Sequence, residues 1–444
     1  MGPRPGLKKD EHPDRRFPFA RQHCRPAGWS LNFLPMKTTR KGISSHAGDN
    51  MKVAKLEAIP VRVPYKRVEE SSLIARGGIA DVLIKVTADN GMVGWGECTR
   101  AADVPGIECA VRAMTPIILG RDPWDKEAIH RDLAVQGLWA FQPMTGNFAY
   151  AGIDMALWDL CGKAAGQPLY RLFGGAQREE VDYFYYMEWG TPKEIEHQAK
   201  DGMKRGYRAY YIKAGVDEHK EEAMLETLRQ IIGPDGKIRI DVNQAWTLPQ
   251  AVRLLKRWHA RFDLDFVEAP VPIDPVENNL DLMRQVDVPI CVNEGLWREA
   301  DAWRIINSRC GSFLCFSQYW VGSLVRFHML VQASHMEGWQ VCKHTHGELG
   351  LTAAAGQHMM LAAPNACLGH QQTAQLMVDD ILTERIPIAD GPRWGRIDKP
   401  GLGVEVDADK VARYHEAYRK YGEFPPYGNR FPVKAARRFS RRHP

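Results

Sequence analysis

Three acidic residues recur at nearly equal intervals in the middle of the chain, each at the end of a short apolar run typical of a buried strand. They are Asp241 after IRI, Glu268 after DFV and Glu294 after PICVN, 27 and 26 residues apart. That interval accommodates one strand, one helix and two loops. If the strands are neighbours in a closed parallel barrel, the carboxylates emerge side by side and repel one another unless a cation joins them. All-oxygen ligands favour a hard divalent ion, so the spacing predicts a Mg²⁺ site.

The composition is that of a globular enzyme that binds neither membranes nor a structural metal through cysteine. Of the 444 residues 44% are hydrophobic and 25% are charged. No apolar run approaches the roughly 20 residues that span a bilayer, so no membrane partner is expected. The nine cysteines are scattered without a C-x-x-C pair, which argues against a disulfide framework or a zinc site. We therefore expect a reducing cytoplasm as the compartment.

The net charge of +5 is concentrated in the two ends of the chain. Residues 1–50 and 429–444 each carry a net charge of +6, which leaves −7 for residues 51–428. A mildly acidic globular part predicts no nucleic-acid partner. The tail ending in RRFSRRHP is expected to be a solvated basic segment.

The first part of the folded chain, residues 51–178, is predicted to be an α+β capping domain. KVAKLEAIPVRV and DVLIKVTADNGMVGWGEC are typical of strands, and Asp89-Asn90-Gly91 is a hairpin turn signal. The stretch Ala149–Gly166 has apolar residues at helical spacing and a terminal glycine. Residues 1–50 are expected to be disordered or an extension, because Met51 opens the first strand-like run.

Residues 179–370 alternate strand-like and helical stretches in about eight units, which predicts a modified TIM-like (β/α)₈ barrel. Residues 371–428 are expected to pack back onto the barrel and the cap, ahead of the basic tail 429–444. A doubly wound open sheet is the alternative, but no glycine-rich phosphate loop follows an early strand.

Several sequence pieces, in this order and spacing, resemble the enolase superfamily, and within it the mandelate racemase and muconate lactonizing enzyme group. They are GIDMALWDLCGKAAGQPLYRLFGG, the Asp241, Glu268 and Glu294 series, and GRIDKPGLGVEVD, within a resemblance that spans about 51–428. The resemblance implies removal of a proton beside a carboxylate. The three acids match the family's Mg²⁺ ligands one by one, and Mg²⁺ would stabilise the charge that deprotonation creates. Relatives are commonly multimeric, so a homo-oligomer is expected.

The general base implied by the resemblance comes from the strand before Asp241. The family has a Lys-x-Lys pattern there, and GYRAYYIKAG places Lys213 at the second lysine and Tyr211 at the first. Residues two apart on a strand face the same way, so both are expected in the site. Tyr211 cannot lower the pKa of Lys213 by like charge, so burial and Mg²⁺ must do so. Tyr211 is expected to donate a hydrogen bond or act as an acid. The alternative for Lys213 is a structural lysine paired to a carboxylate.

The face opposite Lys213 is expected to hold histidines from VCKHTHGELGL. His344 aligns with the family's catalytic histidine, and His346 shares its side of the strand. The family's aspartate partner is replaced by Ser317, so His344 should be less basic and deliver its proton easily, or only bind substrate.

Other polar residues are predicted to bind substrate. The family's glutamate on the eighth strand is replaced by His370 or Gln371. Asn243 matches a polar position facing the pocket. Arg76 of the cap could meet a distal carboxylate or hydroxyl, although a solvated arginine is the alternative.

The leading functional prediction is a Mg²⁺-dependent dehydratase that converts an acid sugar, an aldonate or aldarate, to a 2-keto-3-deoxy acid. Lys213 takes the proton and His344 protonates the departing hydroxyl. A racemase or epimerase with two bases, or a lactonising cycloisomerase, is the alternative. A non-catalytic binding protein on the same fold is the prediction from another class. In each case the partner is a small-molecule carboxylate.

Overall fold

The structure is a computed structural model in which all described residues belong to one compact unit, His46–Pro444. It describes residues 51–424, except for residues 73–74, 100–103 and 138–144. The predicted N-terminal extension, 1–50, and the predicted basic tail, 429–444, lie outside the described residues. Within the described part of the chain, no helix has both the length and the hydropathy needed to cross a membrane.

An antiparallel sheet of three strands begins the described chain. Its order is β1-β2-β3, formed by β1 (Val53–Glu70), β2 (Ala75–Ala88) and β3 (Val93–Cys98). The predicted hairpin turn at Asp89-Asn90-Gly91 is confirmed, because it joins β2 to β3. Gly91 there adopts a left-handed φ of 84°, which glycine takes at little cost.

Helices follow the sheet and one of them, α3, is buried along most of its length against β3. They are α1 (Val104–Ile118), α2 (Lys126–Gly137), α3 (Thr145–Ala165) and α4 (Leu169–Leu172). Glycine is required at the contact, since a Cβ on Gly96 would lie 2.0 Å from a backbone oxygen of α3. The carboxylate of Asp159 on α3 accepts hydrogen bonds at 2.8 Å from the backbone N of Trp95 and of Leu402. α3 thereby links the sheet to the C-terminal segment, and it contains the helix predicted from the sequence.

The central element is a curled parallel sheet of seven strands in the order β11-β10-β9-β8-β7-β6-β5. The strands are β5 (Tyr185–Met187), β6 (Ala209–Lys213), β7 (Lys237–Asp241), β8 (Leu264–Glu268), β9 (Ile290–Val292), β10 (Phe313–Phe316) and β11 (Gln340–Lys343). Isolated parallel bridges connect its two edges to the eighth segment, Val341 to Ala366 and Tyr183 to His370. The predicted barrel with a cap is therefore confirmed, with the closing strand reduced to single bridges.

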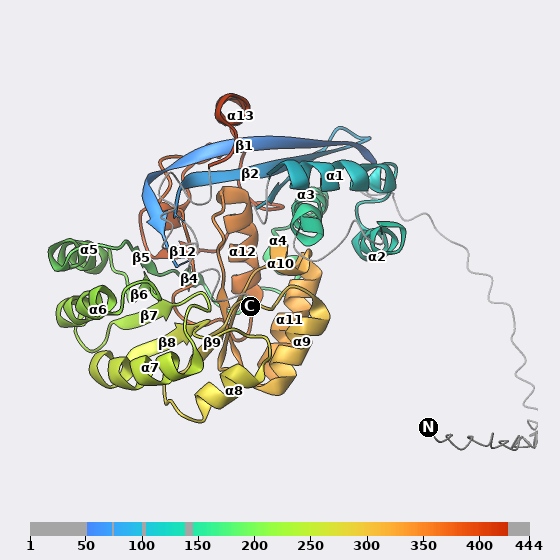
Figure 1. Cartoon of the computed structure of the whole chain (residues 1–444). Helices are drawn as coiled ribbons and strands as arrows, with labels where there is room; N and C mark the ends of the chain where they lie inside the picture. The colour runs from blue at the N-terminus through green and yellow to red at the C-terminus, as the bar shows by residue number, and fades with distance from the viewer. Residues whose placement is uncertain (1–50, 73–74, 100–103, 138–144, 425–444) are drawn as a thin grey trace, which may run out of the picture. The chain divides into compact units, whose positions relative to one another are not determined.

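Helices cover the outside of these strands (Figure 1). They are α5 (Pro192–Lys204), α6 (Glu218–Ile232), α7 (Leu248–Phe262), α8 (Glu277–Met283), α9 (Glu299–Ser308), α11 (Leu324–Met336) and α12 (Gly350–Ala362). The short α10 (Gln318–Val321) instead packs against α3 and α11. Local sequence explains where they start: Thr191 and Glu194 form a capping box at α5, and Thr247 and Gln250 form one at α7. Each box encloses a proline in the first turn of the helix, where its missing N–H costs nothing.

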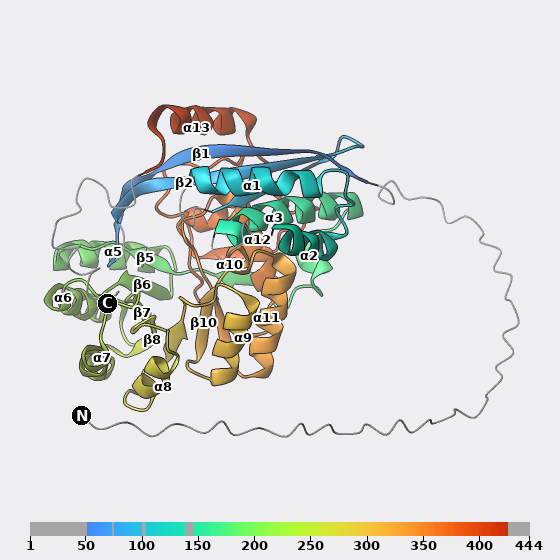
Figure 2. The ribbon, with the colours of Figure 1, turned by 45° about the vertical axis from the view of Figure 1, so that its right-hand side comes forward.

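The C-terminal segment returns to the cap. It contains a 3₁₀ turn (Pro387–Ala389), β12 (Arg393–Gly395), which pairs with β4 (Glu180–Asp182), and α13 (Ala408–Tyr421). In Figures 1 and 2 α13 lies along the outer side of β1. The Nδ1 atom of His415 on α13 lies 2.8 Å from the backbone oxygen of Pro60.

The cap is fixed above the end of the barrel where the strands terminate. Glu97 at the end of β3 accepts hydrogen bonds from the backbone N of Leu349 at 2.7 Å and of Thr352 at 2.9 Å. These N–H groups open α12, which follows β11, so Glu97 binds the positive end of that helix. Asp154 of α3 does the same for α11 by accepting from Leu324 N at 2.8 Å. Side chains at the carboxyl ends of the barrel strands therefore lie beneath the cap.

Candidate active site

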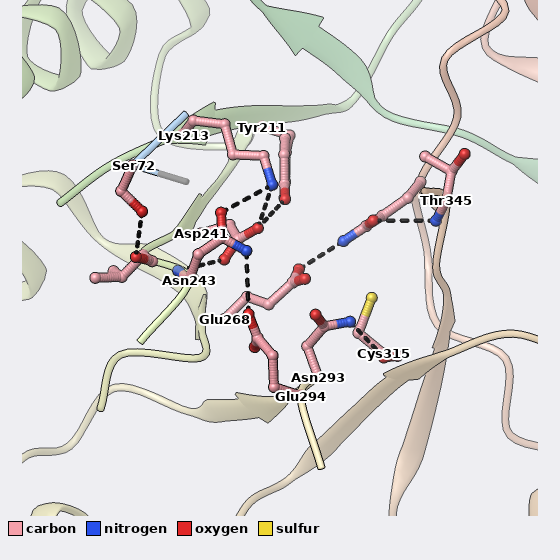
Figure 3. A network of polar contacts seen from close by, with 12 residues as sticks. Ser72, Tyr211, Lys213, Asp241, Asn243, Glu268, Asn293, Glu294, Cys315 and Thr345 are labelled. Carbon is pink, nitrogen blue, oxygen red and sulfur yellow. Dashed lines mark hydrogen bonds and ion pairs between the residues drawn. The ribbon is translucent and has the colours of Figure 1, made fainter. Parts of the chain in front are cut away.

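The three predicted carboxylates lie together at the carboxyl ends of neighbouring strands (Figure 3). Lys213 on β6 pairs in register with Asp241 on β7, and Asp241 pairs in register with Glu268 on β8. Parallel strands in register place these side chains in one row. Glu294 lies two residues beyond the end of β9, which is shorter than the apolar run in the sequence. The sequence spacing thus corresponds to one cluster at the barrel mouth.

A network of hydrogen bonds fixes one side of this cluster. The Tyr211 hydroxyl donates to Asp241 Oδ2 at 2.6 Å, and Lys213 Nζ donates to the same oxygen at 2.5 Å. Asn243 accepts from Lys213 Nζ at 3.2 Å and donates to Glu294 Oε1 at 3.2 Å. Asn243, predicted to bind substrate, therefore also bridges the lysine and a carboxylate.

Two oxygens of the cluster have no hydrogen-bond partner among the described residues. Glu268 Oε1 and Glu294 Oε2 are buried and unpartnered, while Glu268 Oε2 accepts from Gln371 Nε2 at 2.6 Å. Burial, followed by the charge of Asp241, raises the pKa of Glu268 well above its usual range and that of Glu294 to about 7. Buried carboxylate oxygens without donors are costly unless a cation meets them. The donor set therefore fits a hard divalent ion.

Lys213 is held as a cation by the same carboxylates. Burial alone would lower its pKa, but the charges of Asp241 and Glu268 outweigh burial and raise the pKa. Burial thus acts in the expected direction but is outweighed, because Asp241 lies 2.5 Å from the amine. Neutralisation of the carboxylate charge is thus the condition under which Lys213 can act as a base.

Tyr211 is placed as a hydrogen-bond donor. Its ring stacks on Phe184, with centroids 4.4 Å apart and planes 5° from parallel. Burial, with the charge of Asp241, raises the pKa of its hydroxyl well above 10. The geometry favours the hydrogen-bond role over the acid role, because such a hydroxyl keeps its proton.

His344, at the end of β11, has a partner that the sequence did not indicate. Its Nδ1 atom lies 2.8 Å from the Tyr319 hydroxyl, and Ser317 Oγ donates to the His344 backbone oxygen at 2.5 Å. The ring packs on Trp320, with centroids 4.5 Å apart. Burial, followed by repulsion from His346 and Lys213, lowers the pKa of His344 well below 6.5. Ser317 therefore does not hold the ring; Tyr319, two residues later, does.

Arg76 is buried and paired instead of solvated. Its Nε donates to Glu69 Oε2 at 2.6 Å, and its Nη1 donates to the His346 backbone oxygen at 2.8 Å. The Tyr186 hydroxyl donates to Glu69 Oε1 at 3.1 Å. The Glu69–Arg76 pair thus connects the cap to the histidine side of the mouth. The sequence reasoning missed Glu69 and Tyr186, although Glu69 is only seven residues from Arg76.

The structure does not bring His370 to the carboxylate cluster. Its Nδ1 atom accepts from the backbone N of Lys343 at 2.9 Å, and a ring nitrogen lies within 4.8 Å of the sulfurs of Cys342 and Cys367. The ring therefore turns toward the thiols of the barrel interior. Of the two candidates on the eighth segment, Gln371 contacts a predicted metal ligand, Glu268.

The chain matches two family models. Residues 56–174 match the N-terminal domain of mandelate racemase and muconate lactonizing enzyme, and residues 194–410 match the enolase C-terminal domain-like family.

Curated relatives that carry different names match over most of the chain. An N-succinyl-L-Arg/Lys racemase of Bacillus cereus is 24% identical over 369 residues, covering 81% of this chain and 97% of the relative. A D-galactonate dehydratase family member of Salmonella enteritidis is 26% identical over 387 residues, covering 77% and 91%.

Solved structures share the architecture. An isomerase of Streptomyces coelicolor has a TM-score of 0.74 at 27% identity, covering 84% of this chain and 99% of that one. A dipeptide epimerase of Enterococcus faecalis, complexed with Mg and a dipeptide, has a TM-score of 0.74 at 21% identity, covering 80% and 99%, and is similar in fold.

Proposed function

We propose that this chain, which belongs to the mandelate racemase and muconate lactonizing enzyme group of the enolase superfamily, dehydrates an acid sugar. The substrate would be an aldonate or aldarate, and the product a 2-keto-3-deoxy acid. The common first step of the family, removal of the proton beside a carboxylate, agrees with relatives named as racemases and as dehydratase family members.

The residues present fit a Mg²⁺ ion held by Asp241, Glu268 and Glu294. The unpartnered oxygens of Glu268 and Glu294 are the observation that supports this fit. When bound, Mg²⁺ supplies a Lewis acid that offsets the second negative charge created beside a carboxylate. Gln371 and Asn243 orient two of the ligands by donating to Glu268 Oε2 and Glu294 Oε1.

Lys213 is the proposed base on one side of the mouth. Its amine is held between Asp241 Oδ2 and Asn243 Oδ1, and Tyr211 donates to the same Asp241 oxygen. Once the charge of the surrounding carboxylates is neutralised, the Lys213 ammonium can release its own proton to solvent; the neutral amine then takes the proton on C2, and the electron pair of the C2–H bond moves toward the substrate carboxylate. The fixed position of the amine, rather than a neighbouring lysine, is what the chain contributes to this step.

The contact between Tyr319 and His344 is the observation that carries dehydration. In the tautomer in which the hydroxyl donates to Nδ1, the proton of the neutral ring resides on Nε2 and is available to the substrate. No ion pair involves His344 among the described residues, so its imidazolium, favoured when an anionic substrate arrives, is a strong acid. That acid would protonate the hydroxyl on C3 as the C3–O bond breaks. Water leaves, and the enol takes a proton at C3 to become the keto acid.

Racemisation or epimerisation is the second candidate, because Lys213 ends β6 and His344 follows β11, two separate groups able to exchange protons. A racemase needs both groups to act as base in turn. A histidine whose pKa is well below 6.5 and which meets no carboxylate among the described residues is a poor base, so this candidate ranks second.

A panel of aldonates and aldarates tests the proposal. The Mg²⁺-loaded protein should release a 2-keto acid from at least one member, detected as its semicarbazone. Exchange of the C2 proton in D₂O with the hydroxyl retained would identify a racemase instead. No product and no exchange across a broad panel would contradict both.

A further inference from the structure

The end of the cap hairpin that covers the mouth carries a buried ion pair. Arg76 and Glu69 are each 6% exposed, and Arg76 Nε donates to Glu69 Oε2 at 2.6 Å. Ser72, between them in sequence, donates its hydroxyl to the Val242 backbone oxygen at 3.1 Å, next to Asp241 and Asn243. Figure 3 shows Ser72 beside the carboxylate cluster. The hairpin end is therefore attached to the barrel at the catalytic mouth.

The two charges of this pair face the two sides of the site. Glu69 accepts from the Tyr186 hydroxyl at 3.1 Å, and the Tyr186 ring lies 5.7 Å from that of Tyr211 on the lysine side. Arg76 donates to the His346 backbone oxygen on the histidine side. A substrate held between Lys213 and His344 would thus meet the pair with its far end.

A cavity of about 340 Å³ lies on the Glu69 side of the pair. It is lined by Glu69 and Tyr186 and by Trp189, whose indole N–H donates to the Lys213 backbone oxygen at 2.7 Å. The cavity therefore adjoins the strand that carries the base. Its volume is in the range of small-molecule sites.

The charges around this cavity cancel. Glu69 is paired with Arg76, and Glu188 is paired with Arg67 at 3.1 Å. Burial alone would raise the pKa of Glu69, but the charge of Arg76 outweighs it and holds the pKa below its usual range. Both partners are therefore ionised, and no unpaired cation lines the cavity among the described residues.

We infer that the substrate carries a single carboxylate, as an aldonate does, and presents uncharged hydroxyl groups to the Glu69–Arg76 pair. This rests on the proposed dehydration. A second carboxylate at the far end would lose its hydration beside Glu69 without gaining a free cation. A hydroxyl can donate to a Glu69 oxygen, because each carboxylate oxygen accepts more than one hydrogen bond.

Matched aldonates and aldarates of equal length and configuration test the inference on the wild-type protein with Mg²⁺. The aldonate should be preferred by at least about tenfold in kcat/KM, which is the effect of a modest difference in electrostatic complementarity. Equal or better turnover of the aldarate would overturn the inference and leave dehydration standing. Turnover of neither class would overturn both.

Glu69→Gln tests the cause of the preference. The variant leaves the charge of Arg76 uncompensated, so the aldonate-to-aldarate ratio should fall by about tenfold or more. Glu218→Gln is the matched control, because Glu218 pairs with Arg253 and Arg257 between α6 and α7 and its loss should not change the ratio. An unchanged ratio in folded Glu69→Gln protein would contradict the assigned role; if that variant does not fold, the wild-type comparison still decides.

Discussion

The hydroxyl of Tyr319 lies 2.8 Å from the Nδ1 atom of His344. A hydroxyl in this position orients the ring, but it cannot stabilise an imidazolium as a carboxylate would. The same arrangement that orients His344 therefore keeps it weakly basic. The weak basicity of His344 is the physical reason for preferring dehydration to proton exchange between two bases.

Removal of the Tyr319 hydroxyl should impair catalysis through His344. In Tyr319→Phe the Nδ1 atom loses its hydrogen-bond partner, so the ring of His344 is no longer held in position. We expect kcat to fall by about tenfold or more, which is part of the full effect of a general acid on the rate. The pH profile of kcat should shift, which a purely structural change would not cause. Tyr210→Phe, which removes the hydroxyl that donates to Tyr207 O at 3.3 Å, is the control. Equal effects of both substitutions would contradict the positioning role.

Lys213→Met should separate catalysis from metal binding. Without its base the protein should lose at least about a hundredfold in kcat, while Mg²⁺ binding measured by titration calorimetry should persist, because the carboxylates remain. Lys237→Met removes a lysine paired with Asp265 at the opposite end of the barrel and should retain turnover. Substantial turnover by the Lys213 variant would show that this lysine is only a structural partner of Asp241.

Mg²⁺ should stabilise the protein more at pH 8 than at pH 5. The pKa of Glu294 is raised to about 7, and that of Glu268 is raised well above its usual range. At pH 5 Glu294 holds a proton, whereas at pH 8 it is charged and a cation relieves its repulsion with Asp241. Thermal unfolding with EDTA and with Mg²⁺ at the two pH values measures this. A shift in Tm of equal size at both would contradict the assigned ligands.

A buried histidine away from the site should make the fold sensitive to acid. Tyr170 N donates to His358 Nδ1 at 3.3 Å, and His358 Nε2 donates to Leu402 O at 3.2 Å. Burial lowers the pKa of His358 from 6.5 to about 4. Between these values only the unfolded chain binds the proton, so stability is lost as pH falls from 6.5 to 4, by up to about 3 kcal/mol.

His358→Gln tests this, because an amide can accept from Tyr170 N and donate to Leu402 O without titrating. Urea unfolding of the variant should show a flatter loss of stability between pH 6.5 and 4 than wild type. Identical pH dependence would show that other groups cause the acid sensitivity.

The sequence predicted the barrel, the cap and the carboxylate cluster because their signals are periodic and local. Strands that end in Asp241 and Glu268 must meet at one rim once the sheet is parallel. The end of β9 could not be predicted, because the strand-like run in the sequence continues to Glu294, whereas the strand itself ends at Val292.

The partners that complete the site depend on three-dimensional packing. Tyr319 reaches His344 only because α10 turns back over the end of β10. No residue spacing in the sequence predicts this change of chain direction. Glu69 meets Arg76 across the hairpin end, where β1 and β2 are paired with an irregular register. His370 was predicted at the rim because it aligns with the family's glutamate, whereas its ring lies next to the thiols of Cys342 and Cys367.

Proton NMR of an active acid sugar turned over in D₂O by the Mg²⁺-loaded enzyme tests the central claim most directly. Loss of the C2 proton followed by loss of the C3 hydroxyl predicts a 2-keto-3-deoxy acid with one deuteron at C3. Recovered acid with deuterium at C2, its hydroxyl intact and its C2 configuration scrambled, would contradict dehydration and identify His344 as a second base.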